Sequence, residues 1–461
     1  MSLLSEISEK QSQLTKHAVG SVKELCALAI PLMLSALSGT LMIFIDRVVL
    51  SHYSATAMNA AASAGIVFAV FQFGSICIAA MAQSFVGQYN GAKRYSELAK
   101  PVWQMIWFSL LTTIPFTILA LWGSTLFIPA ETVLEGRPFL STLLFFGPIF
   151  PLNAALGGFF IGQGKVKFVT TVLLIASGIN FILDLWFVFG YGHFPAMGAH
   201  GAALATGLAQ SLNAVILITR FLWKDNRLRF NTHHWQFCPP LFMQCLKVGA
   251  PNAIGHMVHI AAWAVVMFIL TKVSFEHITV FAMLQSVWIL LMFIVDGLQK
   301  SVSTVCANLI GANQREGINK VLRSGIRLQS YISLLLALPL VIFPEYCMQI
   351  LSSQEDKNVS ESLVLLAADA CLWVWLGFWF DGINWVIAGI LTAAGDTRFV
   401  MKINAINGWF FGVLPYFIII YLLGAPVYVV GYLMAGFSII NCLCFVKYYR
   451  KGAWQKKSLL A

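Results

Sequence analysis

Charged side chains are scarce in this chain of 461 residues, of which only 10% are Asp, Glu, Lys or Arg. Soluble domains carry about 25% charged residues, and their cores do not require a chain that is 59% hydrophobic. The mean hydropathy is +0.79. The composition therefore excludes a soluble globular protein and indicates an integral membrane protein that crosses the bilayer many times.

Several motifs are also missing. The nine cysteines form no CxxC pair and lie mostly in apolar runs, which excludes a zinc site or a disulfide framework. No Walker A motif is present, so the chain is not an ATP-driven pump by itself. No nucleophile and base stand at helical spacing, so we expect no enzyme and no cofactor. The polar first 24 residues lack a signal-peptide h-region, and we expect the first span to direct insertion.

Twelve apolar stretches are long enough to cross the bilayer as helices, which takes ~20 residues each. They lie near 25–46, 62–86, 101–122, 138–161, 168–190, 199–222, 248–271, 279–306, 326–350, 362–391, 403–423 and 427–446. The sequence predicts an all-α membrane protein divided at its longest polar connection. The expected parts are an N-terminal segment (1–24), an N-lobe (25–222), a connection (223–247), a C-lobe (248–446) and a tail (447–461).

Positive charge is distributed unevenly between the two sets of loops. If the N-terminus is inside the cell, 24 of the 29 Lys and Arg residues lie in inside segments. The outside segments hold only Arg47, Arg137, Lys272 and Lys357, and Lys300 lies within a span. The positive-inside rule therefore predicts that both termini are cytoplasmic. The basic charge belongs to these loops, so we expect no nucleic-acid partner.

The two halves of the chain resemble each other. Val86–Arg94, VGQYNGAKR, is matched by Ile310–Glu316, IGANQRE, and GQGKVKF at Gly162–Phe168 is matched by AAGDTRF at Ala393–Phe399. An Ala-Ile-Pro at residues 29–31 likewise corresponds to Gly-Ala-Pro at 249–251. Because six spans is an even number, both repeats run in the same direction and are related by a pseudo-two-fold axis along the membrane normal. Such a duplication favours alternating access over a fixed pore.

The stretch Gly162–Thr206 holds a basic turn, an apolar span with Asn180 and Asp184, and a glycine-rich turn that opens the next span. Asn180 and Asp184 are spaced i,i+4, which places both on one face of a helix. A carboxylate is costly at membrane depth, so it indicates a functional site that faces a polar cavity. The alternative is a hydrogen bond between helices that only stabilises the bundle.

These residues resemble the multidrug and toxic compound extrusion (MATE) family of cation-coupled exporters. The strongest match is the order of a basic Gly-x-Gly turn, Asn-x-x-x-Asp, Phe-Gly and Gly-Ala-x-Gly-Ala-Ala-x-Ala-Thr in that stretch. Ile45-Asp46-Arg47 resembles the family's Val-Asp-Thr, with Arg47 where Thr is usual, and Gly395–Arg398 resembles its second-half turn. The resemblance covers nearly the whole chain.

The resemblance implies two six-helix lobes in a V and a cation site in the N-lobe at Asp46, Asn180, Asp184 and Thr206. Two carboxylates, an amide and a hydroxyl supply oxygen ligands for a monovalent cation, and facing carboxylates equally suit a proton. The sequence therefore leaves Na+ and H+ open and predicts no other metal. Asn153 either borders the same cavity or hydrogen-bonds between helices.

The C-lobe fits the family less closely. Asp381 matches an acidic position found in part of the family, whereas His259 stands where those relatives have Glu. His256 is on the same expected face, and both histidines are either pH sensors or neutral packing residues. Asp296 and Lys300, spaced i,i+4, are either a mutually neutralising structural pair or part of the mechanism.

The sequence thus predicts an antiporter that exports small amphipathic, cationic compounds while Na+ or H+ enters. We expect a monomer in the lipid bilayer of a bacterial inner membrane. The alternative is a lipid-linked precursor flippase of the same superfamily. Its members tend to have more than twelve spans and a basic central cavity, whereas Lys300 is the one basic residue within a span here. A channel is disfavoured because no filter element is present.

Overall fold

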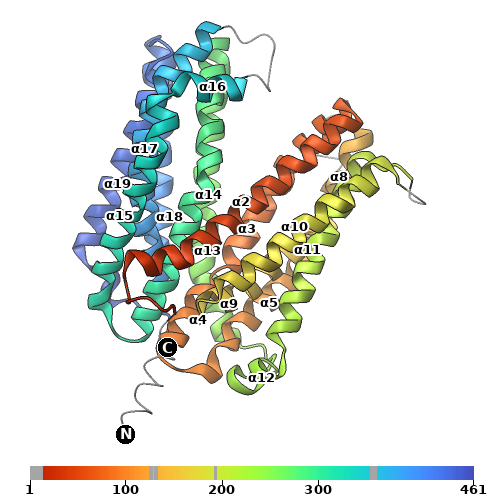
Figure 1. The fold of residues 1–461 in the computed structure, drawn as a ribbon, viewed down its shortest axis with the longest axis vertical. Coiled ribbons are helices and arrows are strands. Elements are labelled where there is room, and N and C mark those ends of the chain that lie inside the picture. Colours follow the sequence, from red (N-terminus) through yellow and green to blue (C-terminus); the bar gives the residue numbers. More distant parts are fainter. Residues whose placement is uncertain (1–13, 124–127, 129–132, 192–194, 353–360, 461) are drawn as a thin grey trace.

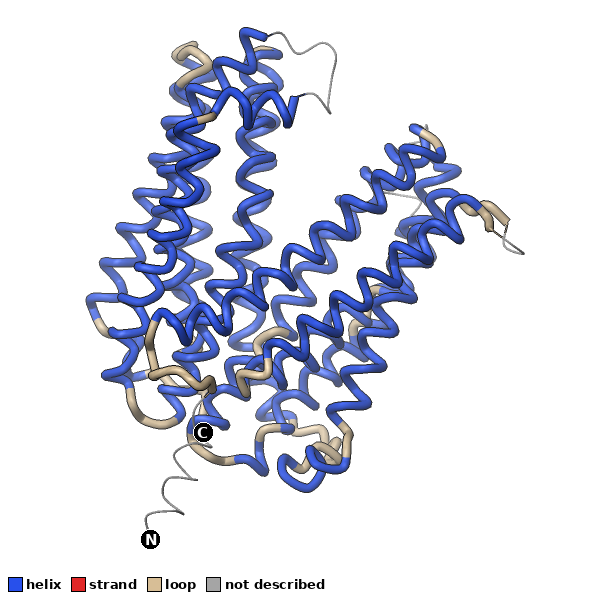
Figure 2. Tube along the Cα trace, viewed as in Figure 1, coloured by secondary structure: helices blue, strands red, loops and turns tan. Residues whose placement is uncertain are grey.

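The computed structural model describes the chain except for residues 1–13, 124–127, 129–132, 192–194, 353–360 and 461. Throughout these described residues the regular structure is helical, and no strand occurs (Figure 2). Twelve helices in the described part are long and apolar enough to cross a membrane. The prediction of an all-α protein with twelve spans is therefore confirmed.

The first six spans form the N-lobe. They consist of α2 (Val22–Tyr53), α3 (Ala55–Ala79) with α4 (Ala82–Gly91), α5 (Ala99–Leu111) with α6 (Thr113–Ile118) and η2 (Leu119–Gly123), α8 (Val133–Phe146) with α9 (Ile149–Gly162), α10 (Val166–Phe189) and α11 (Gly198–Phe221). Most of these helices are apolar on all sides, as expected for helices that pack in a bundle and face lipid.

The last six spans form the C-lobe. They consist of α13 (Pro239–Val273), α14 (Phe275–Gly311), α15 (Ile318–Ala337) with η5 (Leu338–Ile342), α17 (Glu361–Ala393), α18 (Thr397–Asn407) with η6 (Gly408–Val413) and η7 (Tyr416–Leu422), and α19 (Val429–Lys451). Short helices begin the third and ninth spans, η1 (Tyr95–Glu97) and η4 (Arg315–Gly317). Others lie between or after the spans: α12 (Lys224–Phe230), α16 (Pro344–Ser352) and η8 (Ala453–Lys456).

The bounds of the seventh and ninth predicted spans differ most from the structure. The seventh was expected at 248–271, but α13 begins at Pro239, so the end of the predicted connection 223–247 is helical. The ninth was expected at 326–350, but the continuous span runs over Arg315–Ile342 and Pro344 starts a separate helix, α16. Apolar windows miss polar helix ends that other helices bury. Pro344 is the first residue of α16, and the residue before a proline is biased away from helical backbone, as at Phe343 with φ −125° and ψ 51°.

The two lobes diverge from each other in the shape of a V (Figure 1). They lie together at the end of the molecule where the described part of the chain begins and ends, and their helices separate towards the opposite end. Helices α2 and α14 cross between the lobes, and a Cβ added at Gly297 of α14 would lie 2.6 Å from the backbone nitrogen of Met33 of α2. The equivalent crossing joins α3 to α13, where Gly249 lies against the backbone of Ile78.

The backbone repeats the sequence duplication at the turns. Lys93 and Asn313, which follow α4 and α14, both have positive φ, 58° and 57°. Gly164 and Gly395, which precede α10 and α18, have φ values of 77° and 80°. Since positive φ is uncommon for residues other than glycine, the shared values at Lys93 and Asn313 indicate equivalent turns in the two halves.

The helices α4 and α14 make the tightest contact between the lobes, near the termini. A Cβ at Gly91 of α4 would collide with the carbonyl oxygen of Asn308 of α14, and a Cβ at Gly311 of α14 would collide with that of Gln88 of α4. The Nδ2 of Asn90 donates to the Oδ1 of Asn308 at 2.7 Å. The Nε2 of Gln83 donates to the Oγ1 of Thr304 at 2.9 Å. Glycine at the crossing therefore lets two polar helix ends hydrogen-bond to each other.

The C-terminal segment adds a second connection at the same end. The backbone N–H of Leu459 donates to the Oε1 of Gln88 in the N-lobe at 2.8 Å. Lys457 forms an ion pair of 2.6 Å with Asp396 in the C-lobe. The side chain of Leu459 is buried in the core of the N-lobe. The segment thus bridges the two lobes where they already touch.

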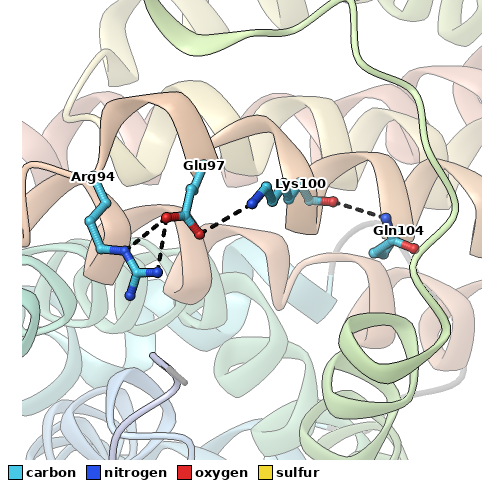
Figure 3. A network of polar contacts seen from close by, with 4 residues as sticks. All are labelled: Arg94, Glu97, Lys100 and Gln104. Carbon is cyan, nitrogen blue, oxygen red and sulfur yellow. Dashed lines mark hydrogen bonds and ion pairs between the residues drawn. The ribbon is translucent and has the colours of Figure 1, made fainter.

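A polar network fixes the start of the third span (Figure 3). Glu97 accepts from Arg94 at 2.9 Å and from Lys100 at 3.4 Å, while Gln104 donates to the carbonyl of Lys100 at 3.3 Å. Gln104 also donates to the carbonyl of Gln236, one of the residues between α12 and α13. The connection between the lobes is thereby held against the N-lobe.

Candidate functional site

Three helices bring the four predicted N-lobe residues together. Asp46 is on α2, Asn180 and Asp184 are one turn apart on α10, and Thr206 is on α11. The helices α10 and α11 approach closely because Gly201 packs against the backbone of Phe187. Small residues at such a contact let neighbouring polar side chains meet within the bundle.

The four side chains form one polar group. The Oγ1 of Thr206 donates to the Oδ2 of Asp46 at 3.1 Å, and the Nδ2 of Asn180 lies 3.5 Å from the Oγ1 of Thr206. The carboxylates of Asp46 and Asp184 are close enough to interact electrostatically. Two carboxylates held near each other repel unless a proton or a cation compensates their charge.

The site has more oxygen acceptors than donors. Asp184 is 0% exposed and Asn180 is 1% exposed. Both carboxylate oxygens of Asp184, the Oδ1 of Asp46 and the Oδ1 of Asn180 are buried without a hydrogen-bond partner. Unsatisfied buried acceptors are costly, and a proton or a cation surrounded by oxygen atoms would satisfy them. Oxygen atoms of four side chains converge here, and only two of these side chains are carboxylates. The small negative charge of the site therefore fits a monovalent ion.

Asn153 of α9 does not hydrogen-bond to these four residues. Its Nδ2 donates to the Oε1 and to the backbone oxygen of Gln210, both at 3.0 Å. Gln210 on α11 in turn places its Nε2 3.9 Å from the sulfur of Met42. Gln210 is not among the residues that the sequence predicts for the site, although its place four residues after Thr206 sets it on the same helix face. Asn153 and Gln210 thus form a separate polar pair between helices.

Among the described residues, no hydrogen bond joins Asp381, His259 and the Asp296–Lys300 pair to one another. Asp381 on α17 accepts from the Nε1 of Trp385 at 2.9 Å and from the Nδ2 of Asn384 at 3.5 Å. The ring of Trp385 lies 5.7 Å from that of His256 on α13. Asp381 therefore already has two donors, unlike Asp184.

His259 is hydrogen-bonded to an aromatic residue of its own helix. Its Nε2 accepts from the Nε1 of Trp263 at 3.1 Å, so this nitrogen carries no proton. Its ring also lies 5.8 Å from that of Phe437 on α19. The accepted hydrogen bond corresponds to a neutral imidazole packed among aromatic rings.

Lys300 and Asp296 of α14 form an ion pair of 2.7 Å, with side chains that are 43% and 32% exposed. The carbonyl of Lys300 also accepts from Gln83 of α4 at 3.0 Å. The pair therefore lies where the two lobes meet, with the charges of the two side chains compensating each other.

If this pair is structural, losing one charge will cost more than losing both. We expect Lys300→Met and Asp296→Leu each to lower the thermal unfolding midpoint in detergent by a few degrees, because one charge is left uncompensated. The double variant should recover more than half of that loss and keep export. Lys224→Met, at an exposed residue of α12, is the matched control. A double variant as unstable as the two singles combined would contradict the coupling, and a stable but inactive one would place the pair in the transport mechanism.

Within the described residues, no three His, Cys, Asp or Glu side chains are grouped so that they could hold a metal ion. The functional geometry is instead a duplicated twelve-helix bundle with buried oxygen ligands in one lobe. These features are typical of a membrane transporter.

The family model described as MatE matches residues 31–186 and 251–418. The chain therefore belongs to the MATE family of membrane transporters and is not an enzyme. It is similar to a probable multidrug resistance protein NorM of Thermotoga maritima, with 23% identity over 98% of this chain and 97% of the relative. It is also similar to the multidrug resistance protein NorM of Aliivibrio fischeri, with 23% identity over 85% of each chain.

Solved structures share the fold. A MATE transporter in the straight conformation superimposes with a TM-score of 0.85 at 16% identity, covering 97% of this chain and 99% of the other. A transporter of the MOP superfamily from Pyrococcus furiosus, described as having a binding pocket of reverse polarity, gives a TM-score of 0.83 at 15% identity with the same coverage. The two-lobed arrangement is thus that of known MATE transporters.

Proposed function

We propose that the chain is an antiporter that exports small, amphipathic, cationic compounds while Na+ or H+ enters. The observation that carries this proposal is the buried carboxylate of Asp184, whose oxygens have no partner and which faces Asp46. The names of the NorM relatives support multidrug export. The protein works as a monomer in a bacterial inner membrane and requires no cofactor besides the coupling ion.

In this proposal the two lobes alternate between two arrangements. When the coupling ion occupies the N-lobe oxygens it removes the cost of the unsatisfied acceptors, so ion binding favours the arrangement in which those oxygens converge. A ligand shifts such an equilibrium only through its difference in affinity for the two states. Trp385, which donates to Asp381, and Trp288, whose ring lies against that of Phe378, suit a flat lipophilic cation.

The test is export from proteoliposomes with one imposed gradient at a time. We expect either a Na+ gradient or a H+ gradient, but not an electrical potential alone, to drive export of a fluorescent lipophilic cation. Export without any ion gradient would contradict the antiporter. The flippase alternative has less support, because Lys300, the basic residue within the spans predicted from the sequence, is paired with Asp296. Flipping of a lipid-linked precursor, with no export of cations, would favour it.

Both termini and the connection that contains α12 are cytoplasmic in this proposal. In a variant without native cysteines, a cysteine at Lys224 should resist an impermeant thiol reagent in intact cells, and one at Leu134, which is 92% exposed at the start of α8, should react. The residue Ser353, between the ninth and tenth spans, would be a second outside position, but it lies outside the described residues. A reagent that labels Lys224→Cys and spares Leu134→Cys would reverse the topology.

A further inference from the structure

A cavity of about 520 Å³ lies beside the turn between α9 and α10. Its lining includes Lys16 and His17 from the N-terminal segment, Lys165 and Lys167 from the turn and the start of α10, and Arg220 from the end of α11. Among the described residues that line it, none is acidic. Five basic side chains from three segments of the chain thus converge on one space.

The charges of this cluster are not neutralised by the protein. In the described part of the chain, the ion pairs involve Glu97, Asp296 and Asp396, and none of these reaches the cavity. The Nζ of Lys165 instead lies 5.4 Å from the ring of Phe230. Partial burial, together with the guanidinium groups of Arg229 and Arg220, lowers the pKa of Lys165 below its ordinary value. An anion in the cavity would relieve this repulsion.

Apolar side chains form the rest of the wall. Leu14, Leu28, Phe160 and Phe168 line the cavity together with the first residues of α10. No side chain caps the N-terminus of α10, so backbone N–H groups of its first turn remain available there. The cavity therefore combines cationic groups with hydrocarbon surface at the level where membrane-spanning helices end.

The corresponding turn of the C-lobe carries an acidic side chain, which the turn of the N-lobe lacks. In the repeat, Lys165 corresponds to Asp396 and Lys167 corresponds to Arg398. Asp396 brings its own negative charge, which binds the Nζ of Lys457 and the hydroxyl of Tyr448, each at 2.6 Å. In the C-lobe, the carboxylate of Asp396 thus compensates the nearby positive charge. At the equivalent position the N-lobe has Lys165, which adds positive charge beside the open cavity.

We propose that this cavity binds the phosphate group of an anionic phospholipid headgroup, with Lys165 and Lys167 as the central contacts. Basic pockets between spanning helices on the cytoplasmic side are suited to such headgroups. A lipid fits better than free phosphate because its glycerol and first acyl carbons would cover the apolar wall. The volume also exceeds what a single phosphate ion fills.

The bound headgroup would also act on the arrangement of the lobes. The segment that contributes Lys16 and His17 continues to Gly20, whose carbonyl accepts from the Oγ of Ser324 on α15 at 2.7 Å. Because α15 belongs to the C-lobe, a headgroup that holds this segment against α10 strengthens a connection between the two lobes.

The experiment measures the thermal unfolding midpoint of the full chain in a neutral detergent. Short-chain phosphatidylglycerol, phosphatidylcholine of the same chain length and inorganic phosphate are titrated separately. We expect a saturable rise with phosphatidylglycerol alone. In Lys165→Gln/Lys167→Gln the half-saturating concentration should be about 30-fold higher, as expected from the loss of two lysines near a headgroup. Arg220→Gln is a second, milder variant.

The matched control is Lys224→Gln/Arg227→Gln, which removes two exposed charges of α12 that do not line the cavity. It should titrate like the unaltered chain. The proposal is overturned if phosphatidylglycerol has no effect, if phosphatidylcholine or inorganic phosphate acts equally, or if the control loses as much as the cavity variants. Since no transport is measured, such a failure would leave the proposed exporter unaffected.

Discussion

Replacing Asp184 by Asn abolishes gradient-driven export, if the N-lobe oxygens hold the coupling ion. An amide has the shape of the carboxylate but neither takes up a proton nor balances a cation. Losing one partner of a buried charged site costs about 3 kcal/mol or more, which corresponds to a roughly 100-fold loss of ion affinity. We expect the same from Asp46→Asn, and a smaller loss from Thr206→Val, which removes the donor to Asp46.

The measurement compares two activities in the same proteoliposomes. Export driven by the ion gradient should be lost, while binding of the labelled substrate should persist. Thermal stability should not fall, because Asn removes a buried charge whose oxygens have no partner. Asp225→Asn, at an exposed residue of α12, is the matched control and should transport normally. Normal export by both Asp184→Asn and Asp46→Asn would remove this site from the mechanism.

The sequence carried most of the information about the fold, because spanning helices must be long and apolar. It was least accurate where helix ends are polar. The end of α14 holds Ser303, Thr304 and Asn308, which are buried only because α4 of the other lobe covers them. Contacts between lobes are not visible in the hydropathy of one segment, so the predicted eighth span, 279–306, ends before Gly311.

Contacts within one helix of the candidate site could be predicted from the sequence, whereas contacts between helices could not be predicted from spacing alone. The shared face of Asn180 and Asp184 follows from their spacing alone, and so does the contact between Asp296 and Lys300. The approach of Asp46 and Thr206 depends on the packing of three helices, and only the family resemblance indicated it. Gln210 was missed because an isolated amide in an apolar helix has no partner that the sequence identifies.

The intramembrane acids of the two lobes have different hydrogen-bond surroundings. Asp381 receives hydrogen bonds from Trp385 and Asn384 of its own helix. Asp184 receives none from the described residues and faces a second carboxylate. A group that is already satisfied gains little from an added ion, whereas an unsatisfied one gains much. This difference favours the N-lobe as the place of ion coupling and leaves Asp381 available to orient the aromatic side chains around it.

The crossing of α4 and α14 should be the most sensitive contact between the lobes. We expect Gly91→Val to reduce export about tenfold, because its Cβ would overlap the carbonyl oxygen of Asn308 and inserting atoms into a tight contact costs about 1–3 kcal/mol. Gly311→Val, which meets the carbonyl of Gln88, should act in the same way. Gly65→Val on α3, where a Cβ would meet nothing within 4 Å, is the matched control.

A cross-link reports directly whether the lobes still meet. The hydroxyls of Ser84 on α4 and Ser303 on α14 are 3.5 Å apart, so cysteines at these two positions should form a disulfide under mild oxidation. Cleavage of the chain in the connection before α13 then leaves the two lobes linked until a reductant is added. Gly91→Val should lower the yield of this cross-link, whereas Gly65→Val should not. If the cross-link forms equally well in Gly91→Val and export is still lost, the glycine acts within α4 and not through the contact between the lobes.

Because Gly91 and Gly311 occupy equivalent places in the two repeats, equal effects of both substitutions would also show that the lobes close symmetrically about their pseudo-two-fold axis.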